Sequence, residues 1–491
     1  MTAEQVEIER KYDADTDFTL PELSDLPGVA AVGPARSHHL HATYFDTDDL
    51  RLAARGITLR RRRGGDDAGW HLKMPVGPDS RAETRAPLGR ARVVPARLAN
   101  LVAAYTRGAQ LRPVATLETE RTVLPLLDED GAVLAEVADD AVTGHDLRDD
   151  RETGTSWREI EVELGSGKPG LLKAAGKRLR KAGARRSASS SKLGRLLDGA
   201  VPQAPPAPVD DGSAGAAVQA YLAAQVAAIL TYDPKARVAE EDAVHKMRVA
   251  VRRIRSTLRS YRPLLVREHV DPLRSELRWL AGVLGEVRDL EVLRMRFTAR
   301  LDELDAGGAG REWLDDIARE ERSAYRRLNA ALKEPRYFAL LDALERLAEA
   351  PPLTDRAARR AAKELPGPVA RAWRRMEKAH AAIATAEDAD EARHETRRAA
   401  KRARYAAEAA VPVLGDAAAR AARDARRVQE VFGGHQDGVI AMARLREIAA
   451  RVRTPAEAFT VGVLYGAERC EAQASLDDLE RIWQRIGAPD F

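Results

Sequence analysis

A proline-rich stretch at residues 201–215, VPQAPPAPVDDGSAG, separates two halves of the chain whose apolar residues recur with different periods. Its four prolines stand among small and acidic residues that cannot build a core, so we expect a stiff, extended linker. Upstream, apolar and polar residues alternate in short stretches, which predicts antiparallel strands. Downstream, alanine, arginine, leucine and glutamate follow the period of helices. We therefore predict an α+β chain, with a β domain over residues 1–200 and an all-α helical bundle over residues 216–491.

Charge and cysteine content indicate in which cellular compartment the protein is expected. Residues 1–200 hold 31 basic and 31 acidic side chains, whereas residues 216–491 hold 49 and 43, so the basic excess lies in the helical half. The single cysteine, Cys470, cannot form a disulfide within the chain, and charged residues occupy the N-terminal positions where a signal peptide needs an apolar core. The longest weakly polar run, residues 216–230, is too short and too rich in alanine to span a bilayer. We expect a cytoplasmic protein with no membrane segment.

Charged side chains share one face of each predicted strand in the N-terminal half. In VEIERKY, Glu7, Glu9 and Lys11 lie on one face, with Val6 and Ile8 on the other. The same alternation groups further charged residues: Arg60 with Arg62, His71 with Lys73, Arg121 among apolar neighbours, and Glu159 with Glu161 and Glu163. Two interpretations fit this pattern. Either the sheets are ordinary ones with a solvated face, or the charged faces converge inside a barrel, where acids beside bases would bind a polyanion together with a divalent metal.

Five motifs follow one another within residues 3–199: VEIERKY, ATYFDTDDLRLAARGITLRRR, WHLK, WREIEVEL and SSSKLGRLL. Together they resemble the CYTH domain, the family of triphosphate tunnel metalloenzymes, whose first strand carries Glu-x-Glu-x-Lys and whose last helix brings a lysine towards a tunnel. The resemblance implies an antiparallel β-barrel with flanking helices. It also implies hydrolysis of a triphosphate with Mg2+ or Mn2+ or, as in some members, cyclisation of ATP.

The same resemblance implies roles for individual positions. Four carboxylates would bind the metal: Glu7, Glu9, Glu159 and Glu161. Six cations would hold the phosphate chain: Lys11, Arg60, Arg62, Lys73, Arg121 and Lys192. Glu136 fits a further acidic position of the family, and we expect an incidental polar role for His71. Hydrolysis requires neutralised equatorial oxygens, an aligned leaving group and a positioned water, and fixed arginine and lysine side chains meet the first two demands.

The helical half carries a basic motif twice. HKMRVAVRRIR at 245–255 and HETRRAAKRAR at 394–404 share His-x2-Arg-x3-(Arg/Lys)-Arg-x-Arg at an offset of 149 residues. At about 100° per residue, the first copy forms one continuous stripe beside an apolar face: His245, Arg248, Arg252, Arg255 and Arg259. The second copy repeats the stripe as far as residue 404, but Glu408 stands where the first copy has Arg259. Such a stripe predicts an anion site on each copy.

Glycine and aspartate positions repeat after each basic motif as well. VLGEVRDLEVL follows the first copy and VFGGHQDGVIA the second, which pairs Gly285 with Gly433 and Asp289 with Asp437. Two motif pairs at nearly constant spacing indicate an internal duplication, with repeats at about residues 216–350 and 365–491 and a pseudo-twofold helical domain.

These paired motifs resemble the CHAD domain, a helical domain named for its conserved histidines, over about residues 216–490. The resemblance implies that a basic groove binds inorganic polyphosphate through nine side chains: His245, Lys246, Arg248, Arg252, Arg255, His394, Arg397, Lys401 and Arg404. Solvated helix faces with intrahelical ion pairs are the simpler alternative, but residues 245–263 contain no acid. Nucleic acid is a weaker candidate partner, because the stripes hold almost no aromatic residues for stacking bases.

The sequence leaves two main classes of function open. The first is an enzyme, a metal-dependent triphosphatase whose helical domain tethers it to polyphosphate. The second is a binding protein in which both domains hold polyphosphate and the tunnel turns over little. A cyclase is a narrower third expectation, since no feature for recognising adenine is evident. Association with polyphosphate granules in the cytoplasm is a further expectation.

Overall fold

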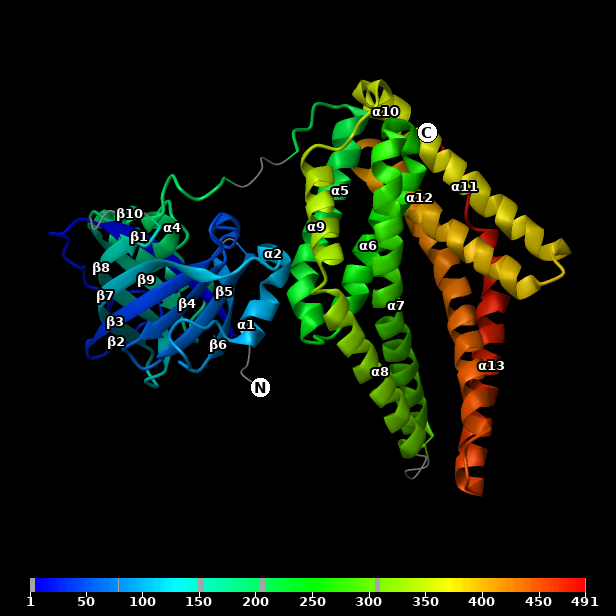
Figure 1. Ribbon diagram of the computed structural model, residues 1–491, viewed down its shortest axis with the longest axis horizontal. Coiled ribbons are helices and arrows are strands. Elements are labelled where there is room, and N and C mark those ends of the chain that lie inside the picture. The colour runs from blue at the N-terminus through cyan, green and yellow to red at the C-terminus, as the bar shows by residue number, and fades with distance from the viewer. Residues whose placement is uncertain (1–4, 78, 149–153, 204–207, 305–309, 491) are drawn as a thin grey trace. The chain divides into compact units, whose positions relative to one another are not determined.

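The computed structural model describes residues 5–77, 79–148, 154–203, 208–304 and 310–490 (Figure 1). The chain forms two compact units, one within residues 1–204 and the other within residues 205–491. The described strands all belong to the first unit, and the second is helical, which confirms the predicted α+β class. Within the predicted linker, residues 204–207 lie outside the described residues, and the first long helix begins at Ala214.

Eight antiparallel strands close the first unit into a barrel. Around the ring they are β1 (Gln5–Ala14), β6 (Ser80–Ala86), β5 (Gly69–Gly77), β4 (Thr58–Arg63), β3 (Arg36–Asp46), β7 (Arg112–Leu127), β8 (Val133–Asp146) and β9 (Thr155–Leu164). β9 pairs back onto β1, with Lys11 opposite Glu161 and Glu9 opposite Glu163. The short β2 (Ala31–Val32) pairs with β7, and β10 (Arg185–Arg186) pairs with β1. Closure gives each of the eight strands one face inside the ring.

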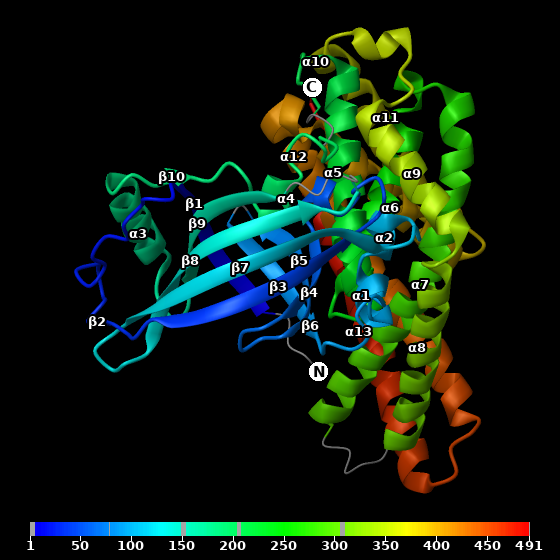
Figure 2. The ribbon, with the colours of Figure 1, turned by 60° about the vertical axis from the view of Figure 1, so that its left-hand side comes forward.

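Helices cover the apolar outer surface of the barrel. α3 (Pro169–Lys181) lies beside the barrel in Figure 2. Its leucines pack against β1 and β9. Leu98 of α1 (Ala96–Leu101) packs against Trp70. Leu193 of α4 (Lys192–Leu196) instead packs against Val142 and Trp157 on the inward faces of β8 and β9, so α4 closes one end of the barrel. The short η1 (Ala53–Arg55) and α2 (Ala103–Thr106) complete the unit. Because the apolar faces point outward into covered cores, the charged faces point inward, and the alternative of ordinary sheets with solvated charged faces is wrong.

The helical unit begins with α5 (Ala214–Arg237), α6 (Ala243–Ser260), η2 (Arg262–Leu264), α7 (Arg267–Glu303), α8 (Arg311–Ala331) and α9 (Pro335–Glu349). After η3 (Asp355–Ala358) and α10 (Ala361–Glu364) follow α11 (Pro366–Ala381), η4 (Ala382–Thr385), α12 (Ala389–Ala449) and α13 (Pro455–Trp483). α12 is two helices joined at Gly415, whose φ of 56° glycine adopts without steric cost. Its halves carry the motifs that α6 and α7 carry in the first copy, so the duplicated motifs lie on corresponding helices.

One described helix, α5, is long and apolar enough to cross a membrane by length and composition, with a mean hydropathy of 1.4. In the structure it packs against α6, α9 and α12 and buries Val218, Leu222, Val226 and Ile229. A core helix of a bundle meets the same test of length and composition, and this packing accounts for the apolar character of α5.

Candidate functional site

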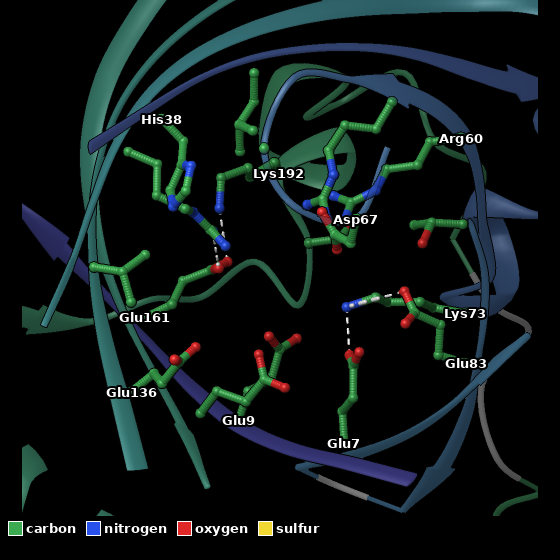
Figure 3. A pocket seen from close by; sticks show the side chains of 18 of the residues that line it. Glu7, Glu9, His38, Arg60, Asp67, Lys73, Glu83, Glu136, Glu161 and Lys192 are labelled. Carbon is green, nitrogen blue, oxygen red and sulfur yellow. Dashed lines mark hydrogen bonds and ion pairs between the residues drawn. The ribbon is translucent and has the colours of Figure 1, made fainter. Parts of the chain in front are cut away.

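Charged side chains from all around the ring line a cavity inside the barrel, with a volume of about 260 Å³. Ten site positions were predicted from the sequence, and nine of them line this cavity: Glu7, Glu9, Lys11, Arg60, Arg62, Lys73, Arg121, Glu161 and Lys192. The tenth, Glu159, is buried in the wall, where Trp157 Nε1 donates to its Oε2 at 2.7 Å. Figure 3 shows carboxylates and cations of this cavity pointing towards one another. The fold therefore brings the predicted acids and bases into one space.

Lys192 closes one side of the cavity at the start of α4, a helix capped by the hydroxyl of Ser191. Its Nζ lies 2.8 Å from Asp140 Oδ2 and 2.7 Å from the Oε1 atoms of Glu159 and Glu161. These three carboxylates offer oxygens within 4.8 Å of one another, a spacing suited to a metal ion. The lysine ammonium already lies among them, so the charge that a metal would supply is present. Sequence analysis did not single out Asp140.

Glu161 is held by three cations. Lys11 and Lys192 contact its Oε1, and Arg121 Nη2 donates to its Oε2 at 2.6 Å. Arg121 also donates to both oxygens of Asp140, at 2.8 and 2.6 Å. Burial disfavours charge on Glu161, but the cationic groups of Lys11, Lys192 and Arg121 hold the pKa of its carboxyl well below the usual range. Glu161 therefore stays ionised, with its oxygens committed to protein cations.

A second group of carboxylates lies where β1 meets β9. Glu9 stands directly opposite Glu163, and Glu7 lies two residues away on the same face. Lys73 contacts Glu7, Arg85 Nη2 lies 3.6 Å from Glu7 Oε1, and Lys11 Nζ lies 3.3 Å from Glu9 Oε1. Glu163 forms no ion pair among the described residues. Burial, together with the carboxylates of Glu7 and Glu9, raises the pKa of Glu163 to about 7. At this end of the cavity, Glu163 is therefore a partly buried carboxyl group without a cation partner in the described part of the chain.

Cations are in excess on the opposite side of the cavity (Figure 3). Arg60 Nη1 donates to Tyr44 Oη at 3.4 Å, while Arg62 contacts Asp67. The Nε atoms of Arg60 and Arg62 are buried without a hydrogen-bond partner among the described residues. Burial, together with the charges of Arg60 and Arg121, lowers the pKa of Arg62 to about 9. Buried donors without acceptors favour an anionic ligand.

His71 lies behind the cavity wall. Its Nδ1 is 2.9 Å from Glu83 Oε1 and its Nε2 is 2.9 Å from the carbonyl oxygen of Asp67. Burial and the nearby charge of Arg60 lower the pKa of His71 to about 4. Glu83, which sequence analysis did not single out, also lies 3.8 Å from Lys73 and so links this wall to the cavity. The predicted acidic position Glu136 lines the cavity.

The two basic motifs of the helical unit face one cavity, here called the shared cavity. Its volume is about 400 Å³, and α6, α7 and both halves of α12 line it. Six of the nine predicted positions contribute: His245, Arg248, Arg252, His394, Arg397 and Lys401. The other three do not. Arg255 lies further along α6, Lys246 lies 3.6 Å from Asp242, and Arg404 Nε donates to Glu408 at 2.7 Å.

In each copy, the aspartate of the repeated motif forms an ion pair with the arginine that follows the histidine by three residues. Arg248 Nη1 lies 3.1 Å from Asp289 Oδ1 in the first copy, and Arg397 Nη2 lies 3.5 Å from Asp437 Oδ1 in the second. The aspartates of the repeated motif therefore orient the arginines at the shared cavity. His394 adds a contact of 3.3 Å between its Nδ1 and Gln436 Oε1.

The repeated glycines explain how the arginines lie so close to the neighbouring helix. A Cβ at Gly433 would lie 3.3 Å from Arg397 Nη2, which is a tight contact. A Cβ at Gly285 would lie 3.6 Å from Arg248 Nη2, which is an ordinary one. Glycine is therefore more strictly required in the second copy than in the first.

Lys401 is the most perturbed cation of the shared cavity. Burial and the charges of Arg397, Arg252 and Arg248 lower its pKa to about 7, and only Asp437 opposes them. The Nε atoms of Arg252 and Arg397 are buried without a hydrogen-bond partner among the described residues. Positive charge therefore exceeds negative charge in the shared cavity, where Asp289 and Asp437 are the lining carboxylates.

Comparisons with known proteins agree with both halves of this architecture. Family models match the CYTH domain over residues 5–196 and the CHAD domain over residues 220–446. The chain is 37% identical to uncharacterized protein MT2285 of Mycobacterium tuberculosis, over 99% of this chain and 97% of that protein. Among solved structures, PptA from Streptomyces chartreusis has 26% identity and a TM-score of 0.46, covering 56% of this chain and 100% of that one. The CHAD domain from Ricinus communis has 24% identity and a TM-score of 0.45, covering 59% and 98%. The chain belongs to the CYTH and CHAD families, with a CYTH domain followed by a CHAD domain.

Proposed function

We propose that the barrel is a metal-dependent triphosphatase that hydrolyses inorganic tripolyphosphate or a related triphosphate, and that the helical unit binds inorganic polyphosphate. The observation that carries the enzymatic part is the division of charge inside one cavity. The Nε donors of Arg60 and Arg62 lack acceptors on one side, while Glu163 on the other side has no cation partner among the described residues and a raised carboxyl pKa. A triphosphate with its divalent metal supplies the missing negative and positive charge.

The cations of the barrel perform the electrostatic part of the proposed reaction. Arg60, Arg62 and Lys73 project from β4 and β5 into the cavity and would bind phosphoryl oxygens. In phosphoryl transfer, charge is spread over these oxygens in the transition state, and donors fixed in advance stabilise it with little reorganisation. Lys11 and Arg121 are already fixed by Glu161, so the cavity is organised before substrate enters.

The donor set fits a hard divalent cation at the junction of β1 and β9. Glu7, Glu9 and Glu163 offer oxygen ligands from two paired strands, and like charges directly opposite each other are unfavourable without a cation between them. Glu159 and Glu161 are less suitable than their sequence positions indicated, because Lys192 already contacts both. When bound, Mg2+ or Mn2+ would neutralise phosphoryl oxygens and make a water molecule a better nucleophile.

The cavity of the helical unit favours a ligand that offers many anionic oxygens. Its unpaired donors and the lowered pKa of Lys401 indicate uncompensated positive charge. Inorganic polyphosphate supplies acceptors along its whole length and needs no stacking partner, whereas single-stranded nucleic acid normally stacks its bases on aromatic side chains.

Phosphate release tests the enzymatic proposal. The full chain is assayed with tripolyphosphate, ATP, thiamine triphosphate and long polyphosphate, each with Mg2+, Mn2+ and Ca2+. Glu9→Gln should reduce turnover about a hundredfold or more while the circular dichroism spectrum stays unchanged. Wild-type rates in this variant at saturating metal would refute the assignment. A pure binding protein would release no phosphate, and a cyclase would convert ATP to cyclic AMP and pyrophosphate.

Binding of the full chain to long polyphosphate tests the second part. Single-stranded DNA of matched charge serves as the competitor at physiological salt. Replacing Arg248, Arg252, Arg397 and Lys401 by glutamine should remove specific binding, since each charge-assisted contact contributes about 1.5–3 kcal/mol. DNA binding as tight as polyphosphate binding, or full binding by this variant, would contradict the proposal.

A further inference from the structure

A second cationic cavity, here called the side cavity, adjoins the shared cavity on the first-copy side. Its volume is about 250 Å³, and it lies among α6, the first half of α7 and the first half of α12. Eight basic side chains line it, and no acidic residue does. Arg252 and Lys401 line both cavities, so the two spaces adjoin through these side chains. Arg274 and Arg278 of α7 lie outside the repeated motifs and contribute only to the side cavity.

Some donors in the side cavity lack acceptors, although Arg274 pairs with Asp271, and Arg398 and Arg402 both pair with Glu395. Among the described residues, the Nε atoms of Arg252 and Arg402 and the hydroxyl of Ser256 are buried without a hydrogen-bond partner. Burial and the charges of Arg278 and Arg274 lower the pKa of Arg255, and no nearby acid opposes them. A buried donor without an acceptor costs about 1–3 kcal/mol. Unpaired donors and mutually repelling cations that line one space fit a ligand with several anionic oxygens.

In the second copy, ion pairs occupy the region that corresponds to the side cavity. Glu408 replaces the counterpart of Arg259, and it accepts hydrogen bonds from Arg253 at 2.9 Å, Arg404 at 2.7 Å and Tyr221 at 3.2 Å. These contacts fill the region with ion pairs inside the protein. Arg426, which corresponds to Arg278 at the offset that relates Asp289 to Asp437, is exposed and pairs with Glu430 at 2.6 Å. The duplicated unit is therefore symmetric at the shared cavity and asymmetric beyond it.

We propose that the side cavity binds a further segment of the same polyphosphate chain, so that the chain leaves the shared cavity on the first-copy side only. The proposal rests on polyphosphate binding by the helical unit. Once the shared cavity holds one part of a chain, binding of the next part is intramolecular and occurs at a high effective concentration. A chain too short to reach Arg259 and Arg278 gains nothing from the side cavity.

Affinity as a function of chain length tests this inference in the full-length protein. A series of polyphosphates of defined length, from tripolyphosphate upward, is titrated without divalent metal into the wild type and two double variants. Arg259→Gln with Arg278→Gln alters the side cavity. Arg423→Gln with Arg426→Gln removes the same charge from exposed positions of the second copy. The barrel is identical in all three proteins, so its contribution cancels in the affinity ratios.

The side-cavity variant should bind short chains as the wild type does and lose at least about tenfold in affinity for each arginine with long chains. The second-copy variant should keep the wild-type length dependence. Equal losses in the two double variants, or losses that are the same for short and long chains, would overturn the inference while leaving polyphosphate binding in place. If the wild type itself shows no preference for polyphosphate over DNA of matched charge, the proposed function fails instead.

Discussion

We predict that Lys401 makes the proposed polyphosphate binding depend on pH. In the free protein its pKa is lowered to about 7 by burial and by Arg397, Arg252 and Arg248. Phosphate oxygens next to the amine favour its charged form and return the pKa towards the ordinary value of about 10.4. Above neutral pH the free amine is largely uncharged, so binding of the polyanion takes up a proton.

The size of the effect follows from these two pKa values. At a pH of about 7.5, roughly one-quarter of free Lys401 is protonated, so binding takes up about three-quarters of a proton. The affinity should change little below a pH of about 6, fall about tenfold from there to about 8, and fall about tenfold again by about 9. The sign is fixed, because the bound state holds the extra proton and a rising pH therefore favours the free state. Burial and Arg288 lower the pKa of His245 from its ordinary value of about 6.5, so His245 titrates below Lys401.

Calorimetry in buffers of different ionisation enthalpy measures this proton uptake directly. Lys401→Arg is the matched control, because the first copy has Arg252 at the corresponding position and an arginine stays charged throughout the range. Titration of the terminal phosphates of the ligand is common to both proteins and cancels. Proton uptake that is equal in the wild type and in Lys401→Arg would refute the reasoning.

Two pairs of substitutions test the barrel and the glycine contacts. Glu161→Gln should lower the stability of the barrel by on the order of 3–5 kcal/mol in thermal unfolding, because Lys11, Lys192 and Arg121 would lose their shared counter-ion. Glu163→Gln should instead make the metal-free protein about 1–2 kcal/mol more stable near neutral pH, because a partly buried carboxyl group no longer has to ionise. This gain in stability grows as the pH rises from about 4.5 to 7. Metal-dependent phosphate release should be lost in the same variant. Equal melting shifts for the two variants would contradict this division of roles. Gly433→Ala should weaken polyphosphate binding several-fold by displacing Arg397, whereas Gly285→Ala should bind like the wild type, although each alanine favours its helix by up to about 1 kcal/mol. Similar affinities for the two alanine variants would show that the arginine can shift freely.

Strand alternation predicted which charged residues share a face, and the resemblance to the CYTH domain placed that face inside a barrel, but neither predicted which carboxylates meet. Glu159, Glu161 and Glu163 lie on one face of β9, and the sequence favoured the first two as metal ligands. The register between β1 and β9 places Glu163 opposite Glu9 and Glu159 opposite Asp13. Register depends on closure of the whole ring, and a shift by two residues leaves the alternation unchanged. For the same reason, Asp140 on β8 could not be connected with Lys192 from the sequence.

The helical periodicity of the repeated motifs predicted which side chains share a stripe, and most of them face the shared cavity. Arg404 is an exception, because Glu408 one turn later accepts its hydrogen bond. The mismatch between Glu408 and Arg259 was visible in the sequence, but its consequence depends on Arg253 and Tyr221, which come from other helices. The side cavity was not predicted, since Arg274 and Arg278 belong to no repeated motif.

The two units differ in whether their clustered cations have carboxylate partners, and this difference agrees with the functions proposed for them. In the barrel, Glu161 and Asp140 lie between Lys11, Arg121 and Lys192, so these cations keep fixed positions without substrate. Fixed charge is what stabilisation of a transition state requires, because reorganisation during the reaction would raise the barrier. In the helical unit, the Nε donors of Arg252, Arg397 and Arg402 lack acceptors among the described residues, and the free protein carries the cost of repulsion between the cations of the two cavities. A polyanion removes that cost when it binds, so the strain of the free state adds to affinity and to the discrimination of long chains from short ones.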